Sequence, residues 1–266
     1  MPIQPQLIAQ PVLWMMSFLI LCFTFFPSFS LGQGNSSFEW NTLYPKIRDR
    51  LISKEEAQGK LNALELSIRE HTFQPLTSEV PRLQGGASSR LARGQENRFC
   101  FPLKGYTFHS IGGTKGSGYQ VQGYDFFDGS QHKGHPGHDL FIQDRDQDGV
   151  DDRTGNPVEV LSVCSGVVVS INGDWQPSSP IRGGNYVWIY DPIKGRYFYY
   201  AHLKEIAVSV GQIVSRGDCL GKVGRTGLNA YPKRSPTHLH FSVHQSIGGY
   251  PKPIDPYSDL VRAGVG

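Results

Sequence analysis

Short apolar runs separated by glycine turns dominate the chain from Phe99 onward. They are rich in β-branched and aromatic residues and cover residues 157–171, 185–203, 206–224 and 238–245. Runs of this composition predict half-buried strands, and residues 185–203 predict two strands joined by a turn at 192–195. We therefore expect a mainly β domain, built on a small antiparallel sheet, over residues 98–266.

The segment before this domain has a different pattern. Residues 41–72 are charged, and their leucines, isoleucines and alanine recur near a helical period, which predicts one or two amphipathic helices. Residues 84–97 are polar and glycine-containing, as is typical of a linker. We place a helical N-terminal region and linker at 33–97.

The N-terminal end has no charged side chain before Glu39, and residues 12–26 are almost wholly apolar. With Pro27 and the small residues after it, this run fits a secretory signal peptide over residues 1–32. No lysine or arginine precedes the run, and its length also fits an uncleaved membrane anchor. Both alternatives predict export to the periplasm, cell envelope or medium, and a membrane contact only if the segment is uncleaved.

Composition and charge narrow the function classes. The net charge is +3 and the basic residues form no stripe, which argues against a nucleic-acid partner.

Three cysteines, Cys100, Cys164 and Cys219, follow the N-terminal segment. Cys164 and Cys219 lie in strand-like runs, so a disulfide between them and three buried reduced thiols are both consistent with the sequence.

The last predicted strand, HLHFSVHQ, places histidines on one face. Because side chains alternate along a strand, His238 and His240 point to one side, while Leu239, Phe241 and Val243 point to the core. His244 shares the histidine face but lies roughly 13 Å beyond His240 at ~3.3 Å per residue. We therefore do not expect His244 to share an ion with them.

A second cluster is the stretch KGHPGHDL, residues 133–140. His135 and Asp139 can share one ion only if the chain bends, and Pro136-Gly137 is a pair that allows a bend. With one histidine of the last strand they would supply three ligands and leave a position for water, which is the arrangement of a catalytic zinc site. His138 is expected to face away, and His132 and His109 receive no role.

Taken together, these motifs resemble the lysostaphin-like (LytM-type) zinc endopeptidases, which cut peptide cross-links of bacterial peptidoglycan. The resemblance covers residues 99–245 and rests on HPGHD (135–139), GGNYVWIY (183–190), YYAHL (199–203), VGQIVSRGDCLGKVGRTG (210–227) and THLHF (237–241). It implies a small antiparallel sheet with an open groove, zinc ligands His135, Asp139 and His240, and catalytic histidines His202 and His238. The implied partners are peptidoglycan stem peptides or cross-bridges.

One segment departs from that family pattern. DRDQDGVDDR (144–153) spaces Asp144, Asp146 and Asp148 before Gly149 as in a calcium loop, and Asp152 adds a carboxylate. Gly155 stands where such a loop has its final acidic ligand. Two interpretations of residues 144–152 are therefore possible: a calcium-binding loop, or an acidic loop that is only solvated.

Three function classes are compatible with these features. A zinc endopeptidase is favoured because all five polar residues of the motifs are present. The alternative is a catalytically silent module that binds peptidoglycan or activates another hydrolase. A biotinyl or lipoyl carrier barrel is disfavoured, because no lysine occupies a marked hairpin tip and because export is expected. For the helical N-terminal region three roles stay open: an autoinhibitory element that covers the groove, a spacer, or a dimer contact.

Overall fold

The computed structural model describes residues 31–73, 98–233 and 235–264. Residues 1–30 of the predicted signal peptide or anchor, and the predicted linker at 84–97, lie outside these ranges. Among the residues that are described, no helix has the length and apolar character needed to cross a membrane.

The N-terminal region forms a helical hairpin of α1 (Leu31–Arg48) and α2 (Lys54–Phe73). Two helices were among the expectations, but α1 begins ten residues before the predicted start. Ser53 caps α2, since its Oγ accepts the amide of Glu56 at 3.1 Å. Leu61 and Ile68 are buried, whereas Leu51 and Leu66, which fit the same periodic pattern, are exposed.

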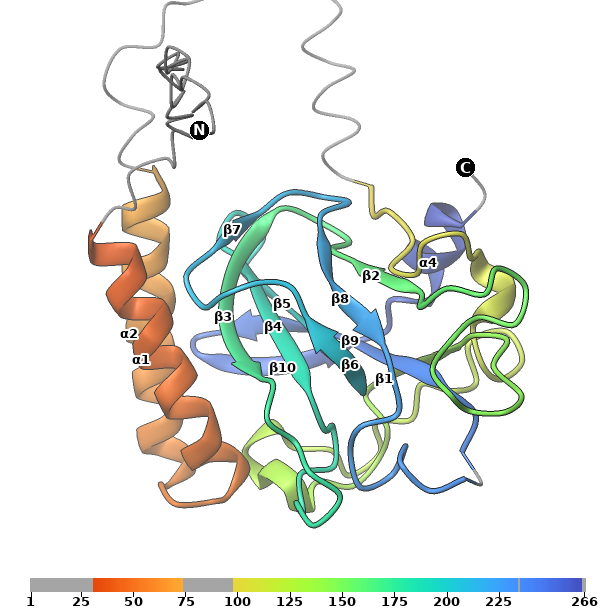
Figure 1. The fold of residues 1–266 in the computed structure, drawn as a ribbon. Coiled ribbons are helices and arrows are strands. Elements are labelled where there is room, and N and C mark those ends of the chain that lie inside the picture. The colour runs from red at the N-terminus through yellow and green to blue at the C-terminus, as the bar shows by residue number, and fades with distance from the viewer. Residues whose placement is uncertain (1–30, 74–97, 234, 265–266) are drawn as a thin grey trace, which may run out of the picture.

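The β domain contains two antiparallel sheets, which confirms the predicted fold class (Figure 1). The large sheet has the order β1 (Gly137–Phe141), β9 (His238–Ile247), β5 (Arg196–Ala201), β4 (Tyr186–Asp191), β3 (Gly166–Asn172) and β7 (Ile213–Val214), with β10 (Tyr250–Ile254) also paired to β9. The small sheet has the order β2 (Glu159–Leu161), β8 (Cys219–Val223) and β6 (Leu203–Ile206). Two 3₁₀ turns, η2 (Phe108–Ser110) and η3 (Phe126–Gln131), and a C-terminal helix, α4 (Tyr257–Ala263), complete the fold.

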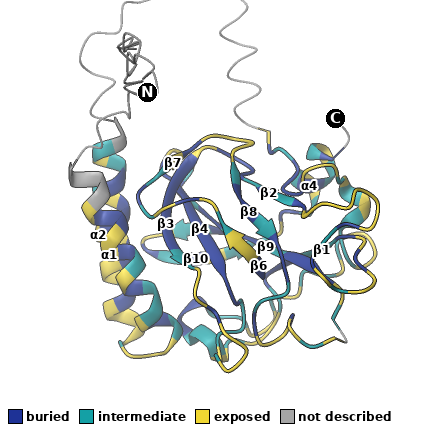
Figure 2. Cartoon of the chain, viewed as in Figure 1, coloured by how far each residue is buried: buried dark blue, intermediate teal, exposed yellow. Residues whose placement is uncertain are grey.

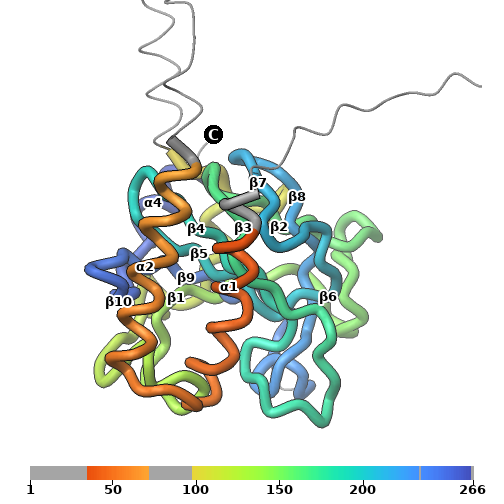
Figure 3. Tube along the Cα trace, turned by 90° about the vertical axis from the view of Figure 1, so that its left-hand side faces the viewer, coloured from red at the N-terminus to blue at the C-terminus, as the bar shows by residue number. Residues whose placement is uncertain are grey.

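The two faces of the large sheet pack against different layers. One face packs with the small sheet in a core that includes Leu239, Phe241 and Val243, as predicted. The hairpin covers part of the opposite face, where Trp40 of α1 is buried among aromatic residues of β4 and β5 (Figure 3). Strand β4 and most of β3 are accordingly buried in Figure 2.

Two aspects of the strands and helices differ from the sequence prediction, and the structure also bears on the cysteines. The apolar run 157–171 is divided into β2 and β3, because the chain crosses from the small sheet to the large one. Strand β10 and helix α4 were not predicted. Cys100, Cys164 and Cys219 are free thiols and form no Cys164–Cys219 disulfide, but only Cys164 is buried, so the alternative of three buried reduced thiols holds for one of them.

Candidate metal centre and groove

Three predicted ligands meet where β1 pairs with β9. Asp139 lies directly opposite His240 in the strand register. The Asp139 carboxylate is 3.2 Å from Nε2 of His135 and 3.0 Å from Nδ1 of His240. One potential ligand atom from each of the three residues lies within 4.8 Å of the others.

These donors fit a zinc ion. Ligands at ~2.0–2.1 Å in a tetrahedron are about 3.3 Å apart, and the two measured separations are close to this value. Two imidazole nitrogens and a carboxylate oxygen are also a donor set that suits zinc. The three residues thus form a candidate metal centre in which the chain leaves room for water or substrate.

Gly137 permits the close approach of β1 to β9. A Cβ atom at this position would lie 2.3 Å from the carbonyl oxygen of Phe241. The expected bend at Pro136-Gly137 is wrong in its location, because Gly137 already pairs with Ser242 as the first residue of β1. The bend at Gly134, whose φ is +75°, comes before both ligands, so His135 and Asp139 reach each other along extended chain.

Backbone carbonyls orient the histidines around the centre. Nδ1 of His135 lies 2.7 Å from the oxygen of Gly118, Nδ1 of His238 lies 2.7 Å from that of Pro236, and Nδ1 of His202 lies 2.8 Å from that of Thr226. Because a carbonyl oxygen can only accept, each Nδ1 donates, and in the neutral ring each Nε2 keeps a lone pair. For a ligand such as His135, a carbonyl partner of this kind fixes the ring toward the metal.

His202 and His238 lie beside the three ligands. Their ring centroids are 4.8 Å apart, and Nε2 of His238 is 3.7 Å from the Asp139 carboxylate. His202 follows β5 with a φ of +67°, a left-handed conformation that is uncommon for a residue with a side chain. The two predicted catalytic histidines therefore face the same centre from β9 and from the β5–β6 junction.

Burial and neighbouring groups set the charges of this cluster. Burial lowers the pKa of His202 to about 3, and the neighbouring His238 and His240 contribute in the same direction. Burial likewise lowers the pKa of His240 to about 4. Burial opposes ionisation of Asp139, but hydrogen bonds from His135 and His240 outweigh it and hold its pKa below the usual range. Burial lowers the pKa of His135, but its polar contacts, led by the hydrogen bond with Asp139, outweigh burial and raise that pKa, so this ring, unlike His202 and His240, tends to hold a second proton on Nε2. Binding of a metal would release that proton, because an imidazole ligand has to be neutral.

The remaining histidines are outside this cluster. His138 is fully buried on the other face of β1, where its Nε2 is 2.9 Å from Asp255, as expected for a residue that faces away. His244 is buried and contacts the Ser242 hydroxyl. His132 lines the groove, while the exposed His109 packs on Phe108.

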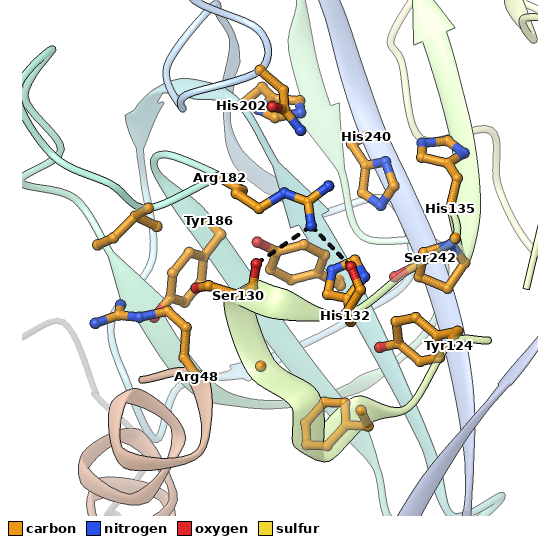
Figure 4. A pocket seen from close by; sticks show the side chains of 18 of the residues that line it. Arg48, Tyr124, Ser130, His132, His135, Arg182, Tyr186, His202, His240 and Ser242 are labelled. Atoms are coloured by element: carbon orange, nitrogen blue, oxygen red, sulfur yellow. Dashed lines mark hydrogen bonds between the residues drawn. The ribbon is translucent and has the colours of Figure 1, made fainter. Parts of the chain in front are cut away.

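The metal centre opens into a groove on the sheet face that the hairpin partly covers. Its lining includes residues that the sequence patterns did not single out, among them Tyr44 and Arg48 of α1 and Arg182 of the β3–β4 connection. Figure 4 shows Arg48 on the opposite side of this groove from His135. The hairpin thus forms part of the groove wall.

The acidic loop at 144–152 brings together Asp144, Asp146 and Asp152. Donors of the protein already bind the Asp144 carboxylate, namely the amides of Asp148 and Gly149 and the hydroxyl of Thr237. Calcium at this loop stays a prediction.

Comparisons with known proteins agree with this picture. Residues 145–256 match the model of peptidase family M23, a range that starts after His135 and Asp139. An L-Ala–D-Glu endopeptidase of Bacillus subtilis is 35% identical over 105 residues, which represent 38% of this chain and 30% of that relative. The chain therefore spans less than a third of the relative's length.

Two solved peptidase structures align with part of this chain. The catalytic domain of lysostaphin from Staphylococcus simulans is 24% identical with a TM-score of 0.34, covering 48% of this chain and 79% of that domain. A zinc-containing peptidase from Vibrio cholerae is 26% identical with a TM-score of 0.37, covering 59% of this chain and 39% of the other.

Proposed function

Because the β domain of this chain belongs to peptidase family M23, we propose that the protein is a zinc-dependent endopeptidase that hydrolyses peptide bonds in bacterial peptidoglycan. The observation that supports it most is the convergence of His135, Asp139 and His240 beside His202 and His238. Family membership supports a peptidase, and the name of the Bacillus subtilis relative supports a peptide of the cell wall as substrate.

The proposed division of roles follows from the contacts. His135, Asp139 and His240 hold the zinc ion, which when bound acts as a Lewis acid on water and on the scissile carbonyl. The Nε2 atoms of His238 and His202 face the same centre, so either can accept the proton of the attacking water. A histidine that has gained this proton can then donate a hydrogen bond to the negatively charged substrate oxygen. The low pKa of His202 keeps this imidazole neutral at physiological pH, so that it begins the reaction as an acceptor.

The proposal places the protein outside the cytoplasm, where peptidoglycan is. The apolar segment at 12–26, which lies outside the described residues, supports export.

Digestion of purified peptidoglycan followed by mass analysis of the fragments tests the proposal. Zinc-loaded protein is expected to create new amine termini, and a chelator should abolish them. His240→Ala should lose the metal, while His238→Ala should retain it and lose roughly 10²- to 10⁴-fold in rate, as expected for removal of a general base.

Metal content measured on each purified variant separates the two roles. If the zinc-loaded protein, with or without residues 1–30, leaves peptidoglycan intact, the silent binding or activating module replaces the enzyme. Equal zinc loss in His238→Ala and His240→Ala would contradict the assignment of ligands.

A further inference from the structure

Arg182 extends into the groove from the β3–β4 connection without an acidic partner among the described residues. Its guanidinium donates to the carbonyl oxygens of Ser130 and His132 at 3.4 and 3.2 Å, and the structure shows no ion pair for it (Figure 4). A guanidinium has five N–H donors in a planar fork. Only one guanidinium nitrogen, Nη1, makes these two long hydrogen bonds, so most of the N–H donors of Arg182 are left to face the groove.

The other charged groups of the groove are already balanced. Apart from histidines, the charged side chains in its lining are Arg48, Asp139 and Arg182. Arg48 forms a two-point pair with Asp49, with both contacts at 2.7 Å. The Asp139 carboxylate faces His135 and His240. Arg182 is therefore the lining cation whose charge is unmatched in the described chain, and bound zinc would make the groove more positive still.

The backbone that carries Arg182 is held in place by close packing. Gly184 has a φ of +65°, and a Cβ there would lie 2.3 Å from the backbone of Thr226. A Cβ on Gly227 would lie 2.3 Å from the carbonyl oxygen of Arg182. The amide of His202 donates to Gly183 at 2.9 Å, which ties this loop to the candidate catalytic histidine. A donor fixed in this way is preorganised for a ligand, so little ordering is needed on binding.

We propose that Arg182 is a specificity-determining residue that binds a free carboxylate of the peptide substrate. The planar fork of arginine matches a carboxylate in a two-point contact. The preferred substrates would then be wall peptides with an ionised backbone or side-chain carboxylate close to the scissile bond, and peptides in which that group is amidated would bind less well. This inference rests on the proposed function, because it assumes that a peptide occupies the groove.

Equilibrium binding of two matched peptides tests the inference without relying on turnover. The probes are a fluorescent stem tetrapeptide, L-Ala-γ-D-Glu-L-Lys-D-Ala, with its backbone carboxylates free, and the same peptide with them converted to carboxamides. The zinc-loaded His238→Ala protein binds them without rapid cleavage. It is expected to bind the acid peptide at least about tenfold more tightly than the amide, as for a hydrogen bond to a charged group.

Substitutions in this background identify the residue responsible. Arg182→Gln should reduce the acid-to-amide ratio to near one, and Arg182→Lys should keep part of it, because the charge remains and the fork is lost. Arg216→Gln, an exposed arginine in the β7–β8 turn outside the groove lining, is the matched control and should leave both affinities unchanged. A direct contact between the acid peptide and zinc would survive Arg182→Gln, so the change in ratio isolates the guanidinium.

Several outcomes overturn the inference: no preference for the acid peptide, no binding of either peptide at millimolar concentration, or an unchanged ratio in Arg182→Gln. Equal weakening of both peptides together with a lower melting temperature would indicate that Arg182 only supports the loop. An Arg182-dependent ratio in a protein that leaves peptidoglycan intact would refute the endopeptidase and keep the carboxylate site. Cleavage of peptidoglycan without an Arg182-dependent preference for the acid peptide would support the endopeptidase and refute the carboxylate site.

Discussion

The space around Gly137 decides whether the candidate metal centre can form. The nearest atoms of β9 are the backbone carbonyl of Phe241 and the Cβ of Ser242, and the Phe241 carbonyl oxygen, 2.3 Å from where a Cβ would stand, has little freedom to retreat. His135 and Asp139 flank this residue in the chain, so any displacement of β1 changes the separation of the ligand atoms. Gly137 matters because its missing side chain lets β1 approach β9 closely.

Gly137→Ala is expected to destabilise the protein by about 1–3 kcal/mol through overpacking and to lower its zinc content. Gly59 is the matched control, because it lies in α2 and a Cβ there meets nothing within 4 Å. Gly59→Ala should stabilise the protein by roughly 0.5–1 kcal/mol through helix propensity and leave zinc content unchanged. Urea unfolding and metal analysis of both variants check this, and normal zinc content in a destabilised Gly137→Ala would argue against the coupling.

Some residues of the candidate metal centre and groove could be identified from the sequence alone, and others could not. Alternation along residues 238–243 correctly separated the histidine face from the core face, because the period of a strand leaves no other choice. The resemblance, and not the spacing, selected His240 over His238 as the ligand. Arg182 gave no signal, since one arginine before two glycines has no periodicity and its groove exists only after β3, β4 and η3 are assembled.

At the scale of elements, the contact between α2 and the sheet contains a buried acid. The Glu65 carboxylate accepts hydrogen bonds from the hydroxyls of Tyr197 and Ser246 at 2.8 and 2.7 Å. Burial raises the pKa of Glu65 above its usual value, and the hydrogen bonds and Arg69 only partly offset this effect. The folded protein therefore binds the proton more tightly than the unfolded chain does.

The sign of the pH dependence follows by linkage. The contribution of Glu65 to stability is complete below the unfolded pKa, near 4.5, and is lost as pH rises through the higher folded pKa. Glu65→Gln keeps an acceptor for Tyr197 and cannot ionise, so it should melt at a higher temperature than wild type at neutral pH. Melting curves between pH 4 and 8 measure this, and identical pH profiles for the two proteins would disprove it.

The sequence did not predict strand β10 or the contacts of the helical hairpin with the sheet, and each omission has a physical reason. Strand β10 contains Pro251 and Pro253, which lower strand propensity, yet it pairs with β9 at the sheet margin, where proline is tolerated. The helical pattern of residues 41–72 indicated an apolar face without indicating its partner. Trp40, a fully buried aromatic residue of the hairpin, lies just before that pattern, so its contacts with the sheet were not foreseen.

For the whole molecule, the hairpin is both a structural layer and a wall of the groove. Trp40 is fully buried, donates to the hydroxyl of Tyr197 at 3.1 Å and packs near Trp188. Removing the hairpin would expose an aromatic face of the large sheet, and apolar patches of that kind promote association. The contacts show that α1 lines part of the groove, while the role of this region as an inhibitor, a spacer or a dimer contact stays a prediction.

A protein that begins at residue 98 is therefore expected to be less stable than one that begins at residue 31, and to self-associate. Light scattering, dye binding to apolar surface and melting temperature are the measurements. The longer form is the control, since it keeps α1 and α2. A monomeric short form with unchanged melting temperature would show that the hairpin is a spacer whose packing contributes little.

The left-handed backbone of His202 has a consequence for how this protein tolerates change. A glycine would adopt the φ of +67° without the cost of roughly 1–2 kcal/mol that a side chain brings. Substitutions chosen for thermostability alone would thus remove the imidazole at this position. At this one position, higher thermal stability and a retained imidazole exclude each other. A stabilised variant that keeps His202 therefore has to increase its free energy of unfolding through substitutions elsewhere in the fold.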